Sequence, residues 1–505
     1  MILSKDNLKH IDNAGVNVPD EALFHLPEKV LQFGTGVLLR GLPAYFIDKA
    51  NRQGIFNGRI AVVKSTNHGS TDDFDNQDNL YTLCIRGIEN GQKIEEDIIC
   101  SAISRVITAT KQWDDILAIA ASKDLEIVIS NTTEVGIQYV EEDITQGVPD
   151  SFPGKLTAVL YHRFKAFNGD KNAGLIIVPT ELIPDNGKKL RNIVVRLARF
   201  NRLEEDFISW LQASNTFCDS LVDRIVPGKP DKETAGEFFA QAGYTDNLIA
   251  VAEVYRLWAI EGDEHVKEKL SFAQADAGVI IAPDIEIYRE LKLRLLNGTH
   301  TLSCGLAFLA GFETVKNAMD NEDMEQFISH LMLDEIAPAI PYAVSPEEAR
   351  DFSVKVLDRF RNQEIKHAWL AITVQYSMKM RMRVVPVLLN HYKLSSAVPE
   401  HIATGFAAYL LFLKPVRHEH GKYYGSVNGL SYLITDDYAG YFYEQWQKHP
   451  DNELVSAVLA NKQLWGEDLT QLSGFEQAVA ARLRSISRNG VLPVLQHLKN
   501  SIVQS

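Results

Sequence analysis

A short apolar segment near the start of the chain leads directly into a glycine-rich turn. Residues 29–33 (Lys-Val-Leu-Gln-Phe) have strand character, Gly34-Thr35-Gly36 follows, and a helical pattern continues to residue 51. A second apolar run at 59–63 comes at the spacing of a compact strand–helix–strand unit. In such a unit the glycines let backbone N–H groups approach a pyrophosphate at the start of the helix. A tight strand–helix turn that binds nothing is the simpler alternative.

The later strands of the first half are predicted to lie in a parallel sheet. The runs at 125–130 and 174–178 are continuous and rich in β-branched residues, which is typical of strands buried on both faces. Helical patterns at 112–122 and 155–167 alternate with these runs. The first half is therefore predicted to be α/β, with a Rossmann-type doubly wound sheet covered by helices.

After about Pro283 the pattern changes to helical periodicity, with few strand-like runs. Helices are predicted there at 292–309, 323–336, 346–360, 402–413, 454–462 and 474–487. A chain of 505 residues is too long for one hydrophobic core. We therefore expect a Rossmann-type dinucleotide-binding domain at 1–285 and a mainly α-helical substrate and catalytic domain at 286–505.

The composition excludes several classes of partner. A net charge of −15 argues against nucleic acid and against an anionic membrane surface, and no apolar run reaches the roughly 18 residues of a membrane-spanning helix. The first residues lack the apolar region of a signal peptide. The four cysteines are scattered without a Cys-x-x-Cys pair, which favours free thiols in a reducing cytoplasm. A monomer and a small homo-oligomer both remain open.

The segment 292–300 (Lys-Leu-Arg-Leu-Leu-Asn-Gly-Thr-His) is the main candidate for catalysis. In an α-helix Lys292, Asn297 and His300 fall within one sector of about 140° and can converge on one oxygen atom. A buried lysine can act as a general base near neutral pH, while Asn and His can donate hydrogen bonds to a carbonyl oxygen that gains negative charge. A metal-free carbonyl reductase needs these groups. An ordinary helix with a surface lysine and a packed histidine would have the same pattern.

Further positions near strand ends are candidates for holding a cofactor. Leu39 replaces the third glycine of a Gly-x-Gly-x-x-Gly motif, and Arg40 follows it, either to pair with a phosphate or to cap the surface. Lys64 stands where an acidic residue usually accepts the ribose hydroxyl, so NAD and NADP are both open on local grounds. The segment 130–136 (Ser-Asn-Thr-Thr-Glu-Val-Gly) ends another strand, either as a ligand-facing edge or as a hydrogen-bonded turn.

Several segments occur in the order of a known family. They are residues 32–40, 130–136, 181–187, 215–225, 292–300 and 359–379. On these segments, which span most of the chain, the sequence resembles the mannitol dehydrogenase family of long-chain polyol dehydrogenases. The Lys-x4-Asn-x2-His element is the most specific of them.

The resemblance implies NAD-dependent, metal-independent hydride transfer, with the active site between an N-terminal Rossmann-type domain and a helical C-terminal domain. It gives Lys292 the role of catalytic base and acid, while Asn297 and His300 position the substrate and stabilise the developing oxyanion. The residues that it implies for cofactor binding are Phe33, Gly34, Thr35, Gly36, Val37, Arg40, Lys64, Asn131 and Thr132.

One departure from the family pattern bears on the substrate. Substrate contacts are implied for Asn186, Asp223 and Lys379, but polyol-specific members carry an arginine eight residues before that lysine, where this chain has Ala371. Neutral sugars are therefore poor candidates. The basic run that starts at Lys379 and includes Arg381 (Lys-Met-Arg-Met-Arg) is a candidate for holding a carboxylate, although arginines on a solvated face would look the same in sequence.

Within this family the sequence most resembles members that act on keto acids derived from hexuronates, so the resemblance implies such a keto acid, reduced to the aldonate, as the small-molecule partner. This substrate and NADH are both anions, so a chain of net charge −15 needs local cations around its site. The candidates are Arg40, Lys64, Lys292, Lys379 and Arg381. Epimeric ketouronates present the same ketone and the same carboxylate, and these residues do not distinguish them.

Two other hypotheses have less support. His418-Glu419-His420 could hold a metal ion, but no third ligand stands nearby, so we expect a solvated loop there and no metal site. His367 and His391 have no partner that the sequence identifies. A non-catalytic NAD-sensing module would not need the complete Lys/Asn/His set, because a sensor transfers no proton.

Overall fold

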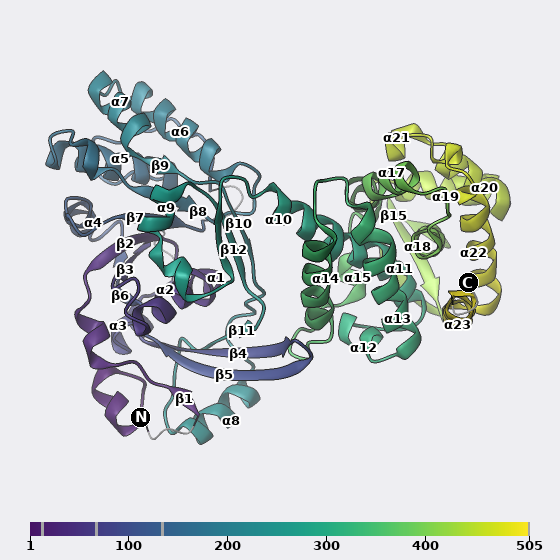
Figure 1. The fold of residues 1–505 in the computed structure, drawn as a ribbon, viewed down its shortest axis with the longest axis horizontal. Helices are drawn as coiled ribbons and strands as arrows, with labels where there is room; N and C mark the ends of the chain where they lie inside the picture. The colour runs from purple at the N-terminus through teal and green to yellow at the C-terminus, as the bar shows by residue number, and fades with distance from the viewer. Residues whose placement is uncertain (12–14, 66–68, 133–135, 503–505) are drawn as a thin grey trace. The chain divides into compact units, whose positions relative to one another are not determined.

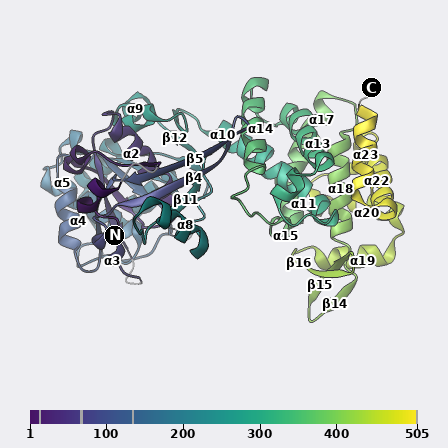
Figure 2. The same ribbon diagram turned by 90° about the horizontal axis from the view of Figure 1, so that it is seen from below.

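The computed structural model describes residues 1–11, 15–65, 69–132 and 136–502. The chain divides into two compact units (Figure 1 and Figure 2). The first unit comprises Met1–Gly87 and Lys93–Ile285, and the second comprises Ile88–Gln92 and Glu286–Ser505. The short segment 88–92, where one strand ends and the next begins, thus belongs with the second unit, which the sequence did not predict.

A six-stranded sheet forms the centre of the first unit. Its order is β6-β3-β2-β7-β8-β9, and neighbouring strands run parallel. In chain order these are the third, second, first, fourth, fifth and sixth strands, which is the Rossmann order, so the predicted fold class is confirmed. The strands are β2 (Glu28–Phe33), β3 (Arg59–Lys64), β6 (Ile103–Thr108), β7 (Ile127–Ser130), β8 (Ile176–Pro179) and β9 (Thr216–Phe217).

Successive residues of the central strands face two different cores. Val30 of β2 packs in one core with helix α2 (Pro43–Arg52), and the next residue, Leu31, packs in the other. This alternation follows from the two-residue repeat of a strand and explains why the runs of β7 and β8 are apolar almost without interruption. The second core is covered by α4 (Trp113–Ala120), α5 (Phe152–Ala166), α6 (Asn186–Phe200) and α7 (Glu205–Ser214).

Two smaller sheets of the first unit were not predicted. Their orders are β1-β5-β4-β11 and β10-β12-β13. The strand β5 is exposed along much of its first half, so its sequence lacks a continuous apolar run. The strands are β1 (Val16–Asn17), β4 (Tyr81–Glu89), β5 (Gln92–Cys100), β10 (Ser220–Asp223), β11 (Ala250–Glu253), β12 (Leu257–Glu261) and β13 (Val279–Ala282). The remaining α-helices are α1 (Val37–Gly41), α3 (Asp72–Asn76), α8 (Lys232–Ala242) and α9 (Glu264–Lys269).

The second unit is mainly helical, as predicted, and α18 lies against both α11 and α22 in it. None of the helices in the described residues has the length and hydropathy needed to span a membrane. The α-helices are α10 (Glu286–Leu291), α11 (Thr299–Leu309), α12 (Val315–Met319), α13 (Glu322–His330), α14 (Pro346–Phe360), α15 (Trp369–Ile372), α16 (Tyr376–Lys379), α17 (Val385–Leu394), α18 (Glu400–Phe412), α19 (Ala439–Lys448), α20 (Asp451–Leu459), α21 (Lys462–Trp465), α22 (Phe475–Asn489) and α23 (Val491–Ile502).

Parts of two predicted helices are wound as π-helices. The segments η5 (Lys292–Gly298) and η6 (Leu331–Ile336) are π-helical, and so is η8 (Met380–Val384) in the basic run. A π-helix forms backbone hydrogen bonds between residues five apart instead of four, and such turns often occur at functional sites. The purely α-helical winding assumed for 292–309 was therefore wrong for its first part.

The predicted loop at 418–420 is also wrong. Residues 417–419 form strand β14 (Arg417–Glu419), which pairs with β15 (Lys422–Val427), and β15 pairs with β16 (Leu430–Ile434). Figure 2 shows this small sheet at the edge of the helical unit. His418 and His420 are exposed, and the His418 ring stacks on Tyr423 with 4.3 Å between centroids. In the part of the chain that the structure describes, no three His, Cys, Asp or Glu residues are grouped to hold a metal.

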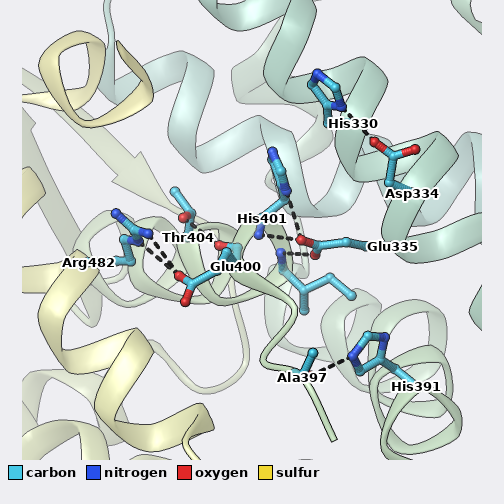
Figure 3. A network of polar contacts seen from close by, with 10 residues as sticks. His330, Asp334, Glu335, His391, Ala397, Glu400, His401, Thr404 and Arg482 are labelled. Atoms are coloured by element: carbon cyan, nitrogen blue, oxygen red, sulfur yellow. Dashed lines mark hydrogen bonds and ion pairs between the residues drawn. The ribbon is translucent and has the colours of Figure 1, made fainter. Parts of the chain in front are cut away.

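A buried carboxylate holds the start of α18 (Figure 3). Glu335, in η6, accepts hydrogen bonds from the backbone N–H groups of His401 and Ile402, both at 2.8 Å, and from Nδ1 of His401 at 2.7 Å. N–H groups in the first turn of a helix have no partner within the helix, and Pro399, at the N-cap, provides no side-chain acceptor. Glu335 therefore acts as the cap of α18 from a distant part of the chain.

We predict that Glu335→Ala destabilises the second unit. The substitution leaves two buried N–H groups without an acceptor, at a cost of about 2–4 kcal/mol in the free energy of unfolding. The matched control is Glu400→Ala, because Glu400 is in the first turn of α18, which Glu335 caps, but forms a partly exposed ion pair with Arg482. That change should cost about 1 kcal/mol or less. Urea denaturation followed by circular dichroism measures both, and equal losses would contradict the capping role.

Candidate active site

The Lys/Asn/His element begins in the π segment η5 and ends in α11. Lys292 and Asn297 are five residues apart, which is the hydrogen-bonding interval of a π-helix, so they lie about one turn apart on one side of the segment. Both are half-buried, and His300 is buried in the first turn of α11. The local winding thus brings Lys292 and Asn297 together more closely than an α-helix would.

The imidazole of His300 is enclosed by aromatic rings. It stacks on Phe360 with 4.2 Å between centroids and an interplanar angle of 7°. The rings of His367 and Trp369 meet it edge-on, with centroids at 5.2 Å and 6.0 Å. Its Nε2 has no hydrogen-bond partner in the described residues. A fixed ring with one unused nitrogen is suited to contact a ligand.

Burial holds the pKa of His300 well below its ordinary value, and nearby positive charge lowers it further. The groups that contribute, after burial, are His367, Arg359, Arg383 and Lys379. Burial followed by the charges of Lys379 and Arg359 also lowers the pKa of His367. His300 is therefore a neutral imidazole, which can donate one N–H to an oxygen without carrying a charge.

The segment η8 lies directly against η5. Arg294 is buried in η5, and its Nη1 donates to the carbonyl oxygens of Met382 at 2.6 Å and Arg383 at 3.0 Å. Its Nε donates to Glu290 at 2.9 Å. In turn, Nη1 of Arg383 donates to Oγ1 of Thr301 at 3.2 Å. These bonds join the basic run to the Lys/Asn/His element.

The charged residues of the basic run have different surroundings. Lys379 is half-buried, its Nζ donates to the carbonyl oxygen of Ile372 at 2.9 Å, and burial lowers its pKa. Arg381 is exposed and donates to the carbonyl oxygen of Gln463 at 3.3 Å. The structure thus brings Lys379 to His300 and leaves Arg381 outside this group.

Sequence reasoning missed several residues around His300. Arg359 and Phe360 stand in the segment 359–379 that carried the family resemblance, but no role was assigned to them. Arg383 is the last residue of the basic run that is a candidate for holding a carboxylate, but the sequence singles out only Lys379 and Arg381 from that run. No sequence pattern indicates a role for His367, because His300, which its ring contacts, is far away in the sequence and is brought close only by folding.

The glycine turn of the first unit is built at the carboxyl end of β2. Gly34 has φ +124°, and a Cβ there would lie 2.8 Å from the carbonyl oxygen of Asn131 and 2.9 Å from Leu39. Gly36 is exposed at the N-cap of α1, and a Cβ there would meet no atom within 4 Å. Phe33 is buried, whereas Thr35 and Val37 are partly exposed. The open backbone of this turn fits a bound pyrophosphate.

Asn131 and Thr132 join the ends of β7 and β8. Asn131 Nδ2 donates to the carbonyl oxygen of Thr180 at 3.1 Å and to its Oγ1 at 2.9 Å. Thr132 donates to the Glu181 carboxylate through its backbone N–H at 2.9 Å and its hydroxyl at 3.0 Å. Burial raises the pKa of Glu181. The rest of this turn, residues 133–135, lies outside the described residues.

The two cations predicted for the cofactor are both buried. The guanidinium of Arg40 donates to the carbonyl oxygen of Leu248 and lies 5.3 Å from the centroid of Tyr81. It therefore faces the interior of the first unit, not the surface of the turn, and burial lowers its pKa. Lys64 ends β3, at the position where an acid usually reads the ribose. Thr66, two residues further on, lies outside the described residues.

Asn186 and Asp223 are buried in the first unit. Asn186 Nδ2 donates to the carbonyl oxygens of Pro179 at 3.1 Å, Glu181 at 3.0 Å and Ser220 at 3.0 Å. Its Oδ1 accepts from the N–H groups of Gly187 and Ser220, both at 2.9 Å. Asn186 thus ties the end of β8 to β10, and Asp223 is the last residue of β10.

Comparisons with known proteins cover nearly the whole chain. Residues 28–274 match the mannitol dehydrogenase Rossmann domain, and residues 284–487 match the mannitol dehydrogenase C-terminal domain. The altronate oxidoreductase of Halalkalibacterium halodurans is 37% identical, covering 94% of each chain. Those of Bacillus subtilis and Escherichia coli K12 are 38% and 35% identical, covering 93% and 94% of this chain and 95% and 97% of theirs.

Two solved structures share the fold. One is Pseudomonas fluorescens mannitol 2-dehydrogenase, in a ternary complex with NAD and D-mannitol, with a TM-score of 0.65, 23% identity and coverage of 99% of this chain and 100% of that one. The other is a substrate-free D-sorbitol dehydrogenase, with a TM-score of 0.76, 20% identity and coverage of 97% and 99%. With both domains matched and full-length relatives above 30% identity, this chain belongs to the mannitol dehydrogenase family.

Proposed function

We propose that this chain is an NAD-dependent altronate oxidoreductase, which interconverts D-altronate and D-tagaturonate. The observation that carries the proposal is the likeness to altronate oxidoreductases along nearly the entire chain. The surroundings of His300 support an anionic substrate, because Arg359, Lys379 and Arg383 all act on it electrostatically. The four cysteines are buried free thiols, which suits the reducing cytoplasm in which we place the reaction.

The glycine turn and the neighbouring strand end provide the proposed cofactor site. The backbone from Phe33 to Val37 faces the pyrophosphate, and Asn131 and Thr132 lie at the adjacent strand end. NAD, when bound, takes up or supplies the hydride. Lys64 stands in place of the acid that usually excludes a 2′-phosphate, so we expect a preference for NADH with measurable use of NADPH.

The second unit supplies the proton and the hydrogen bonds. As the carbonyl carbon of tagaturonate is reduced, its oxygen gains negative charge and a proton must reach it. Lys292 is the proposed proton donor, and in the oxidation of altronate it takes the proton back. Asn297 and neutral His300 donate hydrogen bonds to the same oxygen, and the unused Nε2 of His300 is free to do so. Because His300 is neutral, it does not compete with Lys292 as an acid.

The substrate is tested by comparing kcat/KM for tagaturonate, fructuronate, fructose and fructose 6-phosphate with NADH. We expect tagaturonate to lead. A site that leaves a buried polar group unpaired loses about 1–3 kcal/mol, so the epimer fructuronate should react about 10–100-fold more slowly. If kcat/KM were highest for fructuronate, the chain would be a fructuronate reductase with the same mechanism. If it were highest for fructose, an acidic substrate would be contradicted.

Replacement of the proposed proton donor is the second test. Lys292→Ala should lower kcat for tagaturonate by about 10²–10⁴-fold, because no other group is expected to protonate the alkoxide. Binding of NADH, measured by fluorescence titration, should be retained, since the proposed cofactor contacts lie on the first unit. Turnover of the variant near that of the parent would remove Lys292 from the mechanism.

Metal removal is the third test. Lys292, Asn297 and His300 provide both proton transfer and stabilisation of the oxyanion. The proposed reaction therefore does not require a metal ion. Activity should survive prolonged dialysis against EDTA, measured as NADH oxidation before and after. A loss of activity that Zn²⁺ restores would contradict this assignment.

A further inference from the structure

Arg383 donates to Thr301, the residue that follows His300, and its charge acts on His300, but it has no part in the proposed proton transfer. Its side chain is half-buried, and its one hydrogen bond among the described residues goes from Nη1 to Oγ1 of Thr301 at 3.2 Å. Within the same residues no aspartate or glutamate forms an ion pair with it, and its pKa is lowered by burial. A guanidinium has five N–H donors and stays charged, so most of its donors remain for another partner.

The neighbours of Arg383 are also cations. Its charge lowers the pKa of Lys379, after burial, and both residues act on His300 together with Arg359. The acid that acts on Lys379 is Asp436, whose carboxylate already accepts from the N–H group of Ser377 at 2.7 Å. Like charges that are partly buried together cost free energy unless an anion joins them. The charge in this region is therefore balanced best by an anionic ligand.

The direction of Arg383 is fixed by the fold. Arg294 holds the carbonyl oxygens of Met382 and Arg383, so the π segment η8 is anchored to η5. Thr301, which receives the Arg383 side chain, also donates from Oγ1 to the carbonyl oxygen of Asn297 at 2.7 Å. The guanidinium is thus held close to the element that contacts the reacting carbonyl, with little freedom to lose on binding.

We propose that Arg383 binds the carboxylate of the substrate and thereby makes the enzyme prefer ketouronates to neutral ketoses. Its planar fork matches a carboxylate with two parallel N–H···O bonds, which Lys379 and Arg359 support by charge. This inference rests on the proposed function. It moves the carboxylate contact from Arg381, which is exposed and donates to Gln463, to the arginine two residues further on.

The test compares Arg383→Gln with the parent enzyme on two matched substrates. D-tagaturonate and D-tagatose have the same ketone and hydroxyl configuration, and they differ in a carboxylate against a CH2OH group. Loss of a charged hydrogen-bonded pair should lower kcat/KM for tagaturonate by about 10–100-fold, mainly through KM. Turnover of tagatose and KM for NADH should change less than about threefold. Arg383→Lys keeps the charge without the planar fork, so its kcat/KM for tagaturonate should lie between those of the parent enzyme and Arg383→Gln.

Arg381→Gln is the comparison variant, because it removes the same charge from the same segment at an exposed position. Its kcat/KM for tagaturonate should remain within about twofold of the parent. If Arg383→Gln lowered the values for tagaturonate and tagatose equally, or if only Arg381→Gln raised KM, the proposal would be overturned. If the turnover of tagatose is too slow to measure, the kinetics of Arg383→Gln on tagaturonate decide instead. A raised KM with kcat retained supports the proposal, and a lowered kcat with KM unchanged contradicts it.

Failure of the proposed function can be distinguished from failure of the role proposed for Arg383. If the parent enzyme preferred fructuronate, the same pair of variants would be compared on fructuronate and fructose, and the role of Arg383 would stand or fall on that difference. Thermal unfolding of each variant, followed by circular dichroism, shows whether the fold is intact, and an unfolded Arg383→Gln would be replaced by Arg383→Lys in the comparison.

Discussion

The region of the second unit that holds the Lys/Asn/His element depends on the hydrogen bonds of one buried arginine. Arg294 donates to the carbonyl oxygens of Met382 and Arg383 and forms an ion pair with Glu290. Backbone carbonyls in a buried region need a donor, and a charged donor makes the stronger bond. Through these bonds two π segments, η5 and η8, lie against each other. The Lys/Asn/His element and the basic run, distant in sequence, thereby come to share one site.

The electrostatics of this region differ from those of the whole chain. The net charge is −15, yet the groups that act on His300 are cations and a second imidazole. A local field is set by the residues that line a site, and partial burial strengthens it because water screens it less. Under the proposed function this field stabilises a substrate anion and the oxygen that becomes negative. After burial, it also lowers the pKa of His300.

The sequence predicted four strands of the central sheet, β2, β3, β7 and β8, because strands that are covered on both faces are largely apolar. It missed β6 and β9 of the same sheet and also the smaller sheets, since strands such as β5 are exposed along part of their length and show no continuous run. It also missed the strand at Arg417–Glu419, whose side chains are all exposed. The π winding of Lys292–Gly298 has no signal in hydrophobic periodicity, because one extra residue per turn shifts the pattern only locally.

The sequence by itself determined the Rossmann-type sheet, the helical second half and the residues of the Lys/Asn/His element, because apolar periodicity and motif spacing are local properties of the chain. Only the tertiary structure decided which charged residues face the site. Arg381 and Arg383 are the same residue type two positions apart, yet Arg381 is exposed, whereas Arg383 is half-buried and donates to Thr301, the residue that follows His300. Arg40 likewise proved to face the interior. The direction of a side chain depends on how its segment is wound and on what packs against it, and those contacts come from residues far away in sequence.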